Sequence, residues 1–376
     1  MVAGEASGDL HGANLVRAMK RLNPDIAVAG IGGKKMEEAG VEILVPCSDM
    51  AVVGVTEVFL RLTTIVRAHL TLRSILKNSP PDLLILIDYP DFNINLARTA
   101  KHYGVPVLYY ISPQVWAWRR GRVRKIAGRV DRMAVILPFE KEFYLKTGTQ
   151  MTVDYVGHPI MDNVPHAMDK EEIKRELGLD GCSKILGLLP GSRNEEVKRL
   201  LPSMIGAAEI LSSRYADLKC VLPIASTISP DLIRSVIGQT SLKIIITPKD
   251  VYRALCVCDL AMVASGTVTL ETAVMGIPMV IAYRLSPPSF WIAKMVAKVP
   301  YVGLVNLIAG EEVVPELIQD EVTPQWLADK ALAILEDENR KSDMIKNLRM
   351  VKERLGSPGA SLRTARIALQ MMGDNC

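Results

Sequence analysis

The chain has 376 residues, of which 49% are hydrophobic and 23% charged, and its formal net charge is only +4. A single hydrophobic core rarely grows beyond ~250–300 residues, so the length predicts two domains, and the composition excludes a disordered chain. The near-neutral charge excludes a global polyanion partner, so any phosphate or nucleic-acid contact must come from a local patch.

The cysteines and the termini indicate a cytoplasmic protein. Only Cys256 and Cys258 are close in sequence, and this pair lacks the paired spacing of a zinc site, so we expect no metal and reduced, mostly buried thiols. The N-terminus has neither the basic nor the apolar region of a signal peptide. Residues 260–283 are apolar, but Ser265-Gly266-Thr267 and Gly276-Ile277-Pro278 divide them into strand, short helix and strand. We therefore predict no membrane span.

Short apolar runs alternate with helical patterns along the chain. A short apolar start at Val2-Ala3 runs into a glycine loop, and a helix-like stretch follows from Leu10. Further candidate strands are residues 83–87, 106–111, 133–137, 185–189, 219–224, 243–247, 259–264 and 278–283. Helix-like segments lie at residues 93–103, 194–213, 250–257 and 267–275. Near-continuous apolar strands separated by helices are typical of parallel sheets that are covered on both faces.

This alternation runs twice. The first set of elements ends near Gly157-His158-Pro159, and the second starts at Lys184. We therefore predict an α/β fold with two doubly wound, Rossmann-like parallel-sheet domains facing across a cleft, at residues 1–160 and 161–346, followed by a helical tail at 347–376. Ligands of such sheets bind beyond the carboxyl ends of the strands, so the loops that follow strands are the candidate sites.

Two loops of the first half carry acidic residues. A glycine loop such as Gly4-Glu5-Ala6-Ser7-Gly8-Asp9 usually cradles phosphate, but Glu5 and Asp9 would repel one. The strand at 83–87 ends in Asp88-Tyr89-Pro90-Asp91-Phe92-Asn93, where we expect one structural and one functional aspartate and a helix cap at Asn93. A carboxylate at this edge of the sheet can serve as a general base.

The strand at 106–111 leads into aromatic and basic residues. Ser112-Pro113-Gln114-Val115-Trp116-Ala117-Trp118 precedes seven basic residues between positions 119 and 132. This combination suits an anionic, amphipathic partner, and a solvated basic helix is the alternative. The sequence contains no RNA-binding motif, so nucleic acid is not expected.

Two loops of the second half favour anions. Pro190-Gly191-Ser192-Arg193 opens one helix and Ser265-Gly266-Thr267 opens another, so backbone N–H groups, a capping Ser192 and the Arg193 fork can hold a diphosphate without a metal. Glu271 can accept ribose hydroxyls, as the acidic residue of dinucleotide folds does. Asn306 either satisfies backbone groups or reaches a ligand. An ordinary helix cap and a helix-stabilising glutamate are the alternatives for these loops.

Two further stretches suit a membrane surface. Residues 57–77 mix bulky apolar groups such as Phe59 and Leu62 with four basic side chains. Residues 289–298, with Phe290 and Trp291, are typical of an interfacial helix with lysine at its edge. Core burial is the alternative explanation for this apolarity.

Together these segments resemble the lipid-A-disaccharide synthase family. The resemblance covers nearly the whole chain, in family order, through GEASGDLHGANL, DYPDFN, YYISPQVWAWRRGRVRKI, ILPFEKEFY, GHP, LLPGSRNEEV, SGTVTLETA, GIPMVIAYR and PYVGLVNLIAGEEVVPELIQ. It implies the B-type glycosyltransferase fold, whose C-terminal tail often packs back on the first domain. Family members usually have a full first strand before the Gly-Glu loop, whereas only Met1-Val2-Ala3 precede it here.

The resemblance also implies the reaction. The 2,3-diacylglucosamine of a UDP-sugar moves, with inversion and without a metal or other cofactor, to the 6-hydroxyl of 2,3-diacylglucosamine 1-phosphate at the cytoplasmic face of the inner membrane of Gram-negative bacteria. Asp91 matches the base, and the donor residues are expected to be Gly191, Ser192, Arg193, Ser265, Gly266, Thr267, Glu271 and Asn306. The acceptor side is expected at Glu5, Ser7, Gly8, Asp9, Asp88, Gln114, Trp116, Arg119 and Arg120. Glu5 or Asp9 bracing the site is the alternative.

Other readings remain open at this point. The same fold serves UDP-sugar 2-epimerases and other lipid-linked glycosyltransferases, and a membrane-bound sugar-nucleotide binding protein is the non-enzymatic alternative. The basic run at 119–125 is a candidate contact for the acceptor phosphate or for anionic lipid. We assign no catalytic role to His11 or His158, and the sequence does not decide the oligomeric state.

Overall fold

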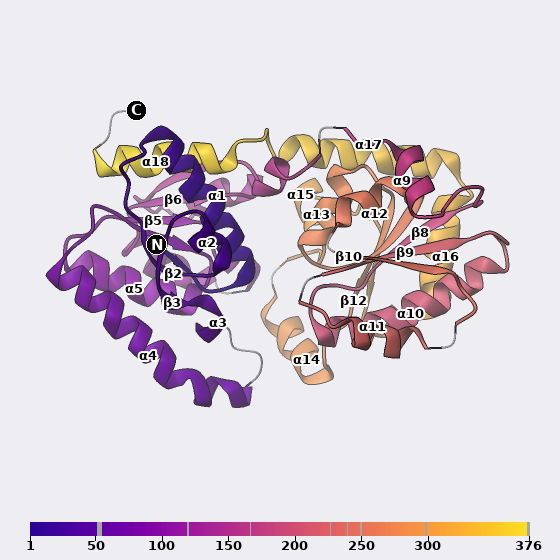
Figure 1. Cartoon of the computed structure of the whole chain (residues 1–376), viewed down its shortest axis with the longest axis horizontal. Coiled ribbons are helices and arrows are strands. Elements are labelled where there is room, and N and C mark those ends of the chain that lie inside the picture. The colour runs from indigo at the N-terminus through magenta and orange to yellow at the C-terminus, as the bar shows by residue number, and fades with distance from the viewer. Residues whose placement is uncertain are drawn as a thin grey trace. The chain divides into compact units, whose positions relative to one another are not determined.

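The chain forms two compact units, each described here by itself. The first contains Met1–Asp162 and the segment that starts at Leu355, and the second contains Asn163–Arg354 (Figure 1). The boundaries expected from the sequence are residues 160 and 346. This computed structural model describes residues 1–50, 55–118, 120–165, 167–225, 227–238, 240–248, 250–297 and 299–373.

The described part of the first unit is built on a seven-stranded parallel sheet, in the order β3-β2-β1-β4-β5-β6-β7. The strands are β1 (Val2–Ala3), β2 (Ala29–Gly32), β3 (Glu42–Pro46), β4 (Leu84–Ile87), β5 (Val107–Tyr110), β6 (Arg132–Val135) and β7 (Thr152–Tyr155). The central strands β4 and β5 are buried along their whole length, with Leu84 opposite Val107 and Ile87 opposite Tyr110. Burial on both faces explains their continuous apolar sequence.

Helices connect these strands and cover the sheet. They are α1 (Ala6–Leu22), α2 (Lys34–Glu38), α3 (Cys47–Met50), α4 (Val55–Asn78), α5 (Pro90–His102), α6 (Val115–Trp118), η1 (Arg120–Arg122), α7 (Val123–Ala127), α8 (Pro138–Leu145) and η2 (Pro159–Asp162). The last helix of the chain, α18 (Ala360–Met372), returns to this unit and packs beside α1 (Figure 1). Arg363 secures it by donating from Nε to the Val156 carbonyl at 2.7 Å.

The described part of the second unit is built on a six-stranded parallel sheet, in the order β10-β9-β8-β11-β12-β13. The strands are β8 (Ile185–Leu189), β9 (Lys219–Ile224), β10 (Ile244–Pro248), β11 (Leu260–Ala264), β12 (Met279–Tyr283) and β13 (Glu316–Ile318). Both sheets are wound outward in two directions from neighbouring central strands. The predicted fold class, two doubly wound parallel α/β sheets, is therefore confirmed.

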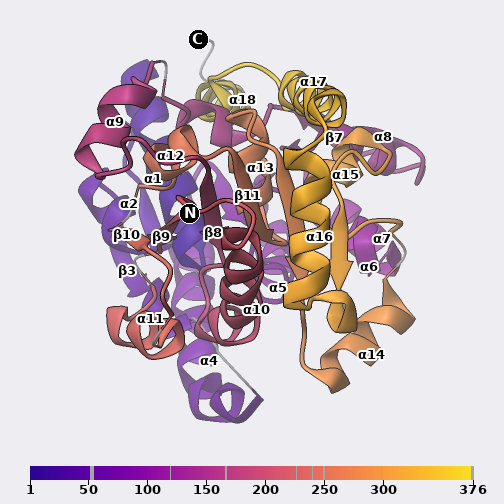
Figure 2. The same ribbon diagram turned by 90° about the vertical axis from the view of Figure 1, so that its right-hand side faces the viewer.

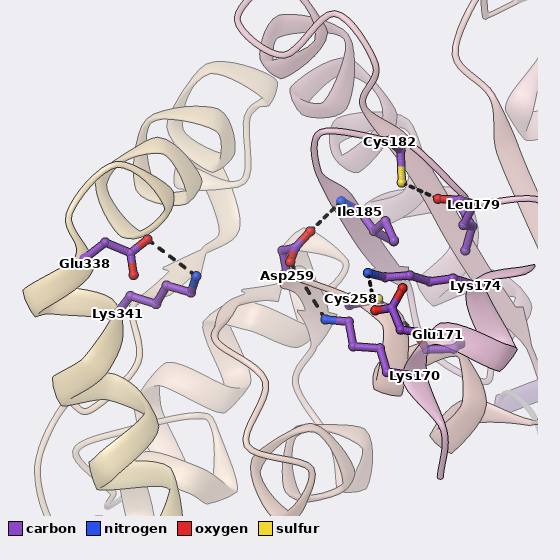
Figure 3. Close-up of polar contacts among 11 residues, drawn as sticks. Lys170, Glu171, Lys174, Leu179, Cys182, Ile185, Cys258, Asp259, Glu338 and Lys341 are labelled. Carbon is purple, nitrogen blue, oxygen red and sulfur yellow. Dashed lines mark hydrogen bonds and ion pairs between the residues drawn. The ribbon is translucent and has the colours of Figure 1, made fainter.

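The helices of the second unit are α9 (Lys170–Glu176), α10 (Asn194–Ser212), α11 (Pro230–Ile237), α12 (Val251–Val257), α13 (Thr267–Val274), α14 (Pro287–Val296), α15 (Leu304–Ala309), η3 (Gln319–Glu321), α16 (Pro324–Leu335) and α17 (Glu338–Arg354). Helices α10 and α16 lie side by side over the sheet (Figure 2). At the amino ends of the strands, the Asp259 carboxylate accepts the N–H of Ile185 at 2.8 Å and lies 4.0 Å from Lys170 Nζ on α9 (Figure 3). These contacts brace the edge opposite to the candidate site.

Residues 260–283 divide as predicted, into β11, α13 and β12. Among the helices that the structure describes, none is long and apolar enough to cross a membrane. The described cysteines carry free thiols, as expected; Cys220 and Cys258 are buried, and Cys47, Cys182 and Cys256 are half-buried.

Candidate functional site

In each unit the candidate loops leave the sheet where the strand order reverses. In the first unit this is between β1 and β4, which are followed by the Gly4–Asp9 and Asp88–Asp91 loops; in the second it is between β8 and β11. Parallel neighbours end at one edge of a sheet, and this reversal point is where doubly wound folds bind ligands. The topology therefore supports searching these loops first.

The turn after β4 is strained. Asp88 and Tyr89 have φ values of 44° and 46°, in the left-handed region that side chains with a Cβ seldom adopt. Asn93 Nδ2 donates to the Ile87 carbonyl at 3.2 Å and to the Asp88 carbonyl at 2.7 Å, and the Tyr109 hydroxyl also donates to the Asp88 carbonyl. The expected cap at Asn93 is wrong: Tyr89 is the N-cap residue of α5, and Asn93 lies buried in its first turn, bracing the turn before it.

The glycine loop after β1 meets this turn. A Cβ at Gly4 would lie 2.3 Å from the ring of Tyr89, so only glycine allows the two loops to approach. Burial, and then the negative charge of the exposed Glu5, raise the pKa of Asp88 to about 6. A carboxyl group with a raised pKa in a strained turn is typical of a functional site.

Asp91 lies in the first turn of α5 and is an exposed carboxylate at this edge of the sheet. Its side chain is 74% exposed, and its Oδ1 lies 2.6 Å from Arg122 Nη2. Arg122 ends η1, so the pair links the loop after β4 to the segment after β5. The sequence analysis noted the basic run but did not identify this partner, because no spacing rule relates residues that lie 31 positions apart.

Two residues expected on the acceptor side are engaged in bracing instead. Asp9 is buried and its carboxylate accepts the N–H groups of Gly33, Lys35 and Met36 at 2.7, 3.1 and 3.0 Å, which caps α2. Trp116 is buried, and its Nε1 donates to Glu140 Oε1 at 3.0 Å. The bracing alternative considered for Asp9 therefore fits the geometry, and Trp116 acts in the same way.

The remaining acceptor-side residues are less constrained. Ser7 and Gln114 are exposed, while Gly8 is buried against Ala3. Arg119 lies outside the described residues, as does the side chain of Arg120, whose backbone opens η1.

Glu140 is a buried carboxyl group that the sequence analysis missed. Besides Trp116, its carboxylate accepts the N–H groups of Ile136 and Leu137 at 3.3 and 3.0 Å. Burial raises its pKa to about 7 against the lowering effect of these donors. A glutamate at the third position of a helix is a recognised capping signal, and it was present in the sequence as Pro-Phe-Glu.

In the second unit, the loop after β8 is occupied by a carboxylate of its own chain. Glu196 Oε2 accepts the N–H groups of Ser192 and Arg193 at 3.1 and 3.3 Å, and its Oε1 lies 3.3 Å from Arg193 Nη1. A Cβ at Gly191, where φ is 108°, would lie 2.2 Å from that Oε2. The expected cap by the Ser192 side chain is wrong, because Arg193 is the N-cap residue of α10.

The second candidate loop, Ser265–Thr267, follows β11, the strand that pairs with β8. Gly266 is the N-cap residue of α13 and has open space around its Cα, and Thr267 is exposed. Ser265 Oγ donates to the Val302 carbonyl at 2.8 Å, which joins this loop to the segment before α15. Glu271, one turn into α13, is half-buried, and burial raises its pKa.

Asn306 is buried and fully engaged within its unit. Its Oδ1 accepts the N–H groups of Val313 and Val314, and its Nδ2 donates to the Val314 carbonyl and to Glu316 Oε1. Glu316 in turn accepts the N–H groups of Val302 and Gly303, each at 2.9 Å. A side-chain amide has two donor hydrogens and one acceptor oxygen, so this geometry fits the bracing alternative for Asn306.

The surface residues expected to contact a membrane differ in exposure. On α14, Trp291 is 63% exposed and Phe290 half-buried. Phe59 and Leu62 belong to α4, but their side chains lie outside the described residues. No group of three or more His, Cys, Asp or Glu side chains within the described ranges is arranged to hold a metal ion.

Comparison with known proteins decides the family. The model of the family described as "Lipid-A-disaccharide synthetase" (LpxB) matches residues 1–368. The lipid-A-disaccharide synthase of Geobacter sulfurreducens is 48% identical over 373 residues, covering 99% of this chain and 97% of its own. The chain belongs to the lipid-A-disaccharide synthase family. It is therefore a glycosyltransferase of lipid A biosynthesis.

Solved structures show the same fold at much lower identity. A structure titled as a putative UDP-N-acetylglucosamine 2-epimerase from Listeria monocytogenes has a TM-score of 0.67 at 14% identity, covering 100% of this chain and 96% of its own. The calicheamicin glycosyltransferase CalG4 has a TM-score of 0.60 at 13% identity, covering 98% and 96%. This likeness is one of fold and places the synthase family member among B-type glycosyltransferase folds.

Proposed function

We propose that this enzyme transfers 2,3-diacylglucosamine from UDP to the 6-hydroxyl of 2,3-diacylglucosamine 1-phosphate, which gives the lipid A disaccharide 1-phosphate and UDP. The observation that carries this proposal is the full-length match to the lipid-A-disaccharide synthases. We assign the acceptor to the first unit and the UDP-sugar to the second, because among the described loops at the two strand reversals only those of the second unit are both small-residue loops that open helices.

The donor diphosphate would bind the loops at Gly191–Arg193 and Ser265–Thr267. The two loops follow adjacent strands, and each precedes a helix whose N-terminus favours negative charge. Arg193, with its side chain 75% exposed, adds a planar fork of donors. Donors that are already oriented stabilise the charge that builds on the leaving diphosphate.

Glu271 would accept the hydroxyl groups of the uridine ribose. Its half-buried position one turn below the Gly266 loop supports this role, since a carboxylate there is too far into the helix to meet the diphosphate. Asn306 would contribute indirectly, by holding the segment that contacts Ser265.

Asp91 would act as the base. The acceptor 6-oxygen forms a bond to the anomeric carbon of the donor, its proton passes to Asp91, and the electron pair of the breaking bond leaves with the diphosphate of UDP. Attack from the face opposite the diphosphate inverts the anomeric centre. The exposure of Asp91 supports this role, because a general base must reach the proton that it removes. Glu5, Ser7, Gly8, Asp88, Gln114, Arg119 and Arg120 remain candidates for acceptor contacts.

The enzyme would work on the cytoplasmic face of the inner membrane, since both sugars carry acyl chains. On α14, the exposed side chains of Trp291 and Met295 and the Lys294 ammonium 5.8 Å from the Trp291 ring centre support this location. An aromatic ring beside a lysine is typical of a helix at a lipid interface.

The test supplies both acylated substrates in neutral detergent micelles and measures UDP release and disaccharide formation. We expect product from the wild type and a loss of about 10²–10⁴-fold in kcat for Asp91→Ala, the range of general-base catalysis. Asp25→Ala, which removes an exposed carboxylate elsewhere in the first unit, is the control and should match the wild type. No product from the wild type would reject the proposed function, and full activity of a folded Asp91→Ala would reject only its role as the base.

A further inference from the structure

A small cavity that includes Asp91 has three cations among its seven lining residues. Its volume is about 140 Å³, and its walls are Pro90, Asp91, Ile94 and Asn95 from α5 and Arg122, Lys125 and Arg129 from the segment after β5. A cavity needs about 10–15 Å³ to admit one water molecule, so this space has room for a compact group of several heavy atoms.

The charge of this cavity suits a phosphate monoester. Arg122, Lys125 and Arg129 against the single carboxylate of Asp91 leave a net charge of plus two at neutral pH. A phosphate monoester carries about −1.5 to −2 at pH 7, so its binding would neutralise the cavity almost completely.

The cations retain donors for such a ligand. Arg122 uses Nη2 for Asp91, and its Nε and Nη1 form no hydrogen bond or ion pair with the described residues. Lys125 is exposed and forms no ion pair with a described carboxylate. Arg129 is half-buried and is held in place by its Nη1, which donates to the Ile94 carbonyl at 3.0 Å. Arg129 is anchored to the backbone, Arg122 also contacts Asp91, and Lys125 is exposed. Together these three cations make a preformed anion site.

We propose that this cavity binds the phosphate of the acceptor sugar, and that Arg122 holds that phosphate and the carboxylate of Asp91 at the same time. The proposal rests on the proposed function, which makes the acceptor a glycosyl 1-phosphate and Asp91 the base.

The chemistry of the acceptor fits this arrangement. Its phosphate is attached to C1 and its attacking hydroxyl to C6, and the ring oxygen of the same sugar joins C1 to C5, the carbon that carries C6. A guanidinium group that contacts the base and the phosphate together therefore sets the attacking hydroxyl beside the base. Arg122 is in this sense a positioning residue, whereas Lys125 contributes binding alone.

The experiment compares the acceptor 1-phosphate with the same diacylglucosamine lacking phosphate, in neutral detergent. The measured quantity is the ratio of kcat/KM for the two acceptors. We expect this ratio to fall about tenfold in Lys125→Ala, the order expected for one charged contact, and to keep its wild-type value in Arg124→Ala. Arg124 is an exposed cation on the same helix that does not line the cavity, so it is the matched control.

Arg122→Gln separates binding from positioning. It should lower this ratio of kcat/KM values and also lower kcat with the unphosphorylated acceptor, because Asp91 loses the ion pair that positions it beside the cavity. An unchanged ratio in both Lys125→Ala and Arg122→Gln, or an equal fall in Arg124→Ala, would overturn the proposal. So would an effect of Lys125→Ala that appears only when vesicles of anionic lipid replace neutral detergent, because the ligand would then be a lipid headgroup.

A titration without turnover keeps this test independent of the proposed function. Glucosamine 1-phosphate and glucosamine are titrated into the wild type and Lys125→Ala, and binding is followed by calorimetry or NMR. We expect the wild type to bind the phosphorylated sugar more tightly and Lys125→Ala to lose most of that preference. If the wild type forms no disaccharide but prefers glucosamine 1-phosphate over glucosamine, the proposed reaction is wrong and the phosphate site stands. If the wild type binds both sugars equally, the proposed phosphate site is wrong.

Discussion

At the scale of single residues, Glu196 occupies the N–H groups that we assign to the donor diphosphate. Its carboxylate accepts the N–H groups of Ser192 and Arg193, in the way that a phosphate oxygen would. A diphosphate arriving at this loop must displace that carboxylate. If the loop binds the diphosphate as we propose, Glu196 holds it in a binding-ready conformation and lowers the affinity for UDP by internal competition.

Removing the charge of Glu196 should therefore tighten UDP binding. We expect Glu196→Gln to lower the Kd of UDP up to about fivefold, equivalent to ~1 kcal/mol at a helix N-terminus, as measured by titration calorimetry. Glu195→Gln is the control, since Glu195 contacts Lys198 and Arg199 and not the loop. Weaker binding by Glu196→Gln would show that the carboxylate organises the loop and does not compete for it.

Asn306 gives a second prediction at this scale. Asn306→Ala leaves the N–H groups of Val313 and Val314 without their buried acceptor, so we expect the free energy of unfolding to fall by about 2–4 kcal/mol in urea denaturation. Asn339→Ala, at an exposed position of the same unit, should change it by less than ~0.5 kcal/mol. A stable Asn306→Ala with weakened UDP binding would contradict the bracing role and favour direct ligand contact.

The positions of the donor loops could be predicted from the sequence, but the side chains that contact them could not. The loops were predicted from local patterns: a glycine between a strand and a helix at Gly191–Arg193, and small residues before a helix at Ser265–Thr267. The contact of Glu316 with Asn306 depends on how α15 folds against β13, which no local pattern encodes. For the same reason Asp91 could be predicted as a candidate base, but its ion pair with Arg122 could not.

At the scale of elements, three of the four edge strands of the described sheets were missed, whereas the edge strand β10 was predicted to within one residue. β8 and β9 begin and end where predicted, because strands covered on both faces read as continuous apolar runs. β2, β3, β7 and β13 were missed. β3, β7 and β13 are edge strands, which need only partial burial, and β2 contains two glycines in four residues.

His11 on α1 and His158, which immediately precedes η2, form a pH-sensitive pair in the first unit. Burial, with the nearby Lys35, lowers the pKa of His11 to about 4; burial, with His11, lowers that of His158 to about 3. Below the unfolded pKa of 6.5 the unfolded chain binds protons that these folded imidazoles exclude. Their contribution to stability is therefore present above pH 6.5 and is lost as the pH falls toward 4.

Other groups act in the opposite direction, so a comparison of variants is needed. The raised pKa values of Asp88 and Glu140 stabilise the folded state as the pH falls from about 7. We expect the stability difference between the wild type and His158→Asn to shrink by on the order of 1–3 kcal/mol between pH 7 and pH 4.5. His102→Gln, at an exposed position, should show no such change. A constant difference across this range would rule out the titration of His158.

At the scale of the whole molecule, the segment from Leu355 that completes the first unit follows the second unit in the sequence. Helix α18 buries Ala365, Ala368 and Leu369 in a unit whose sheet ends at Tyr155. Because α18 belongs to the first unit, we expect a substitution in α18 to change the stability of the first unit and not that of the second.

Leu369→Ala tests this separation. We expect it to destabilise the first unit by about 2–5 kcal/mol and to speed hydrogen exchange within residues 1–162, while exchange within 163–354 stays unchanged. Arg366→Ala, an exposed position on the same helix, should leave both unchanged. Equal acceleration in both units would mean that they unfold as one.

The late return of α18 also sets an order for folding on the ribosome. When Asp162 has been synthesised, the first sheet is complete but the helix that covers α1 does not yet exist. At ~5–20 residues per second, synthesis of Asn163–Arg354 takes on the order of 10–40 s. The second unit can fold within that interval, while the apolar surface that α18 will cover stays open to water and to chaperones.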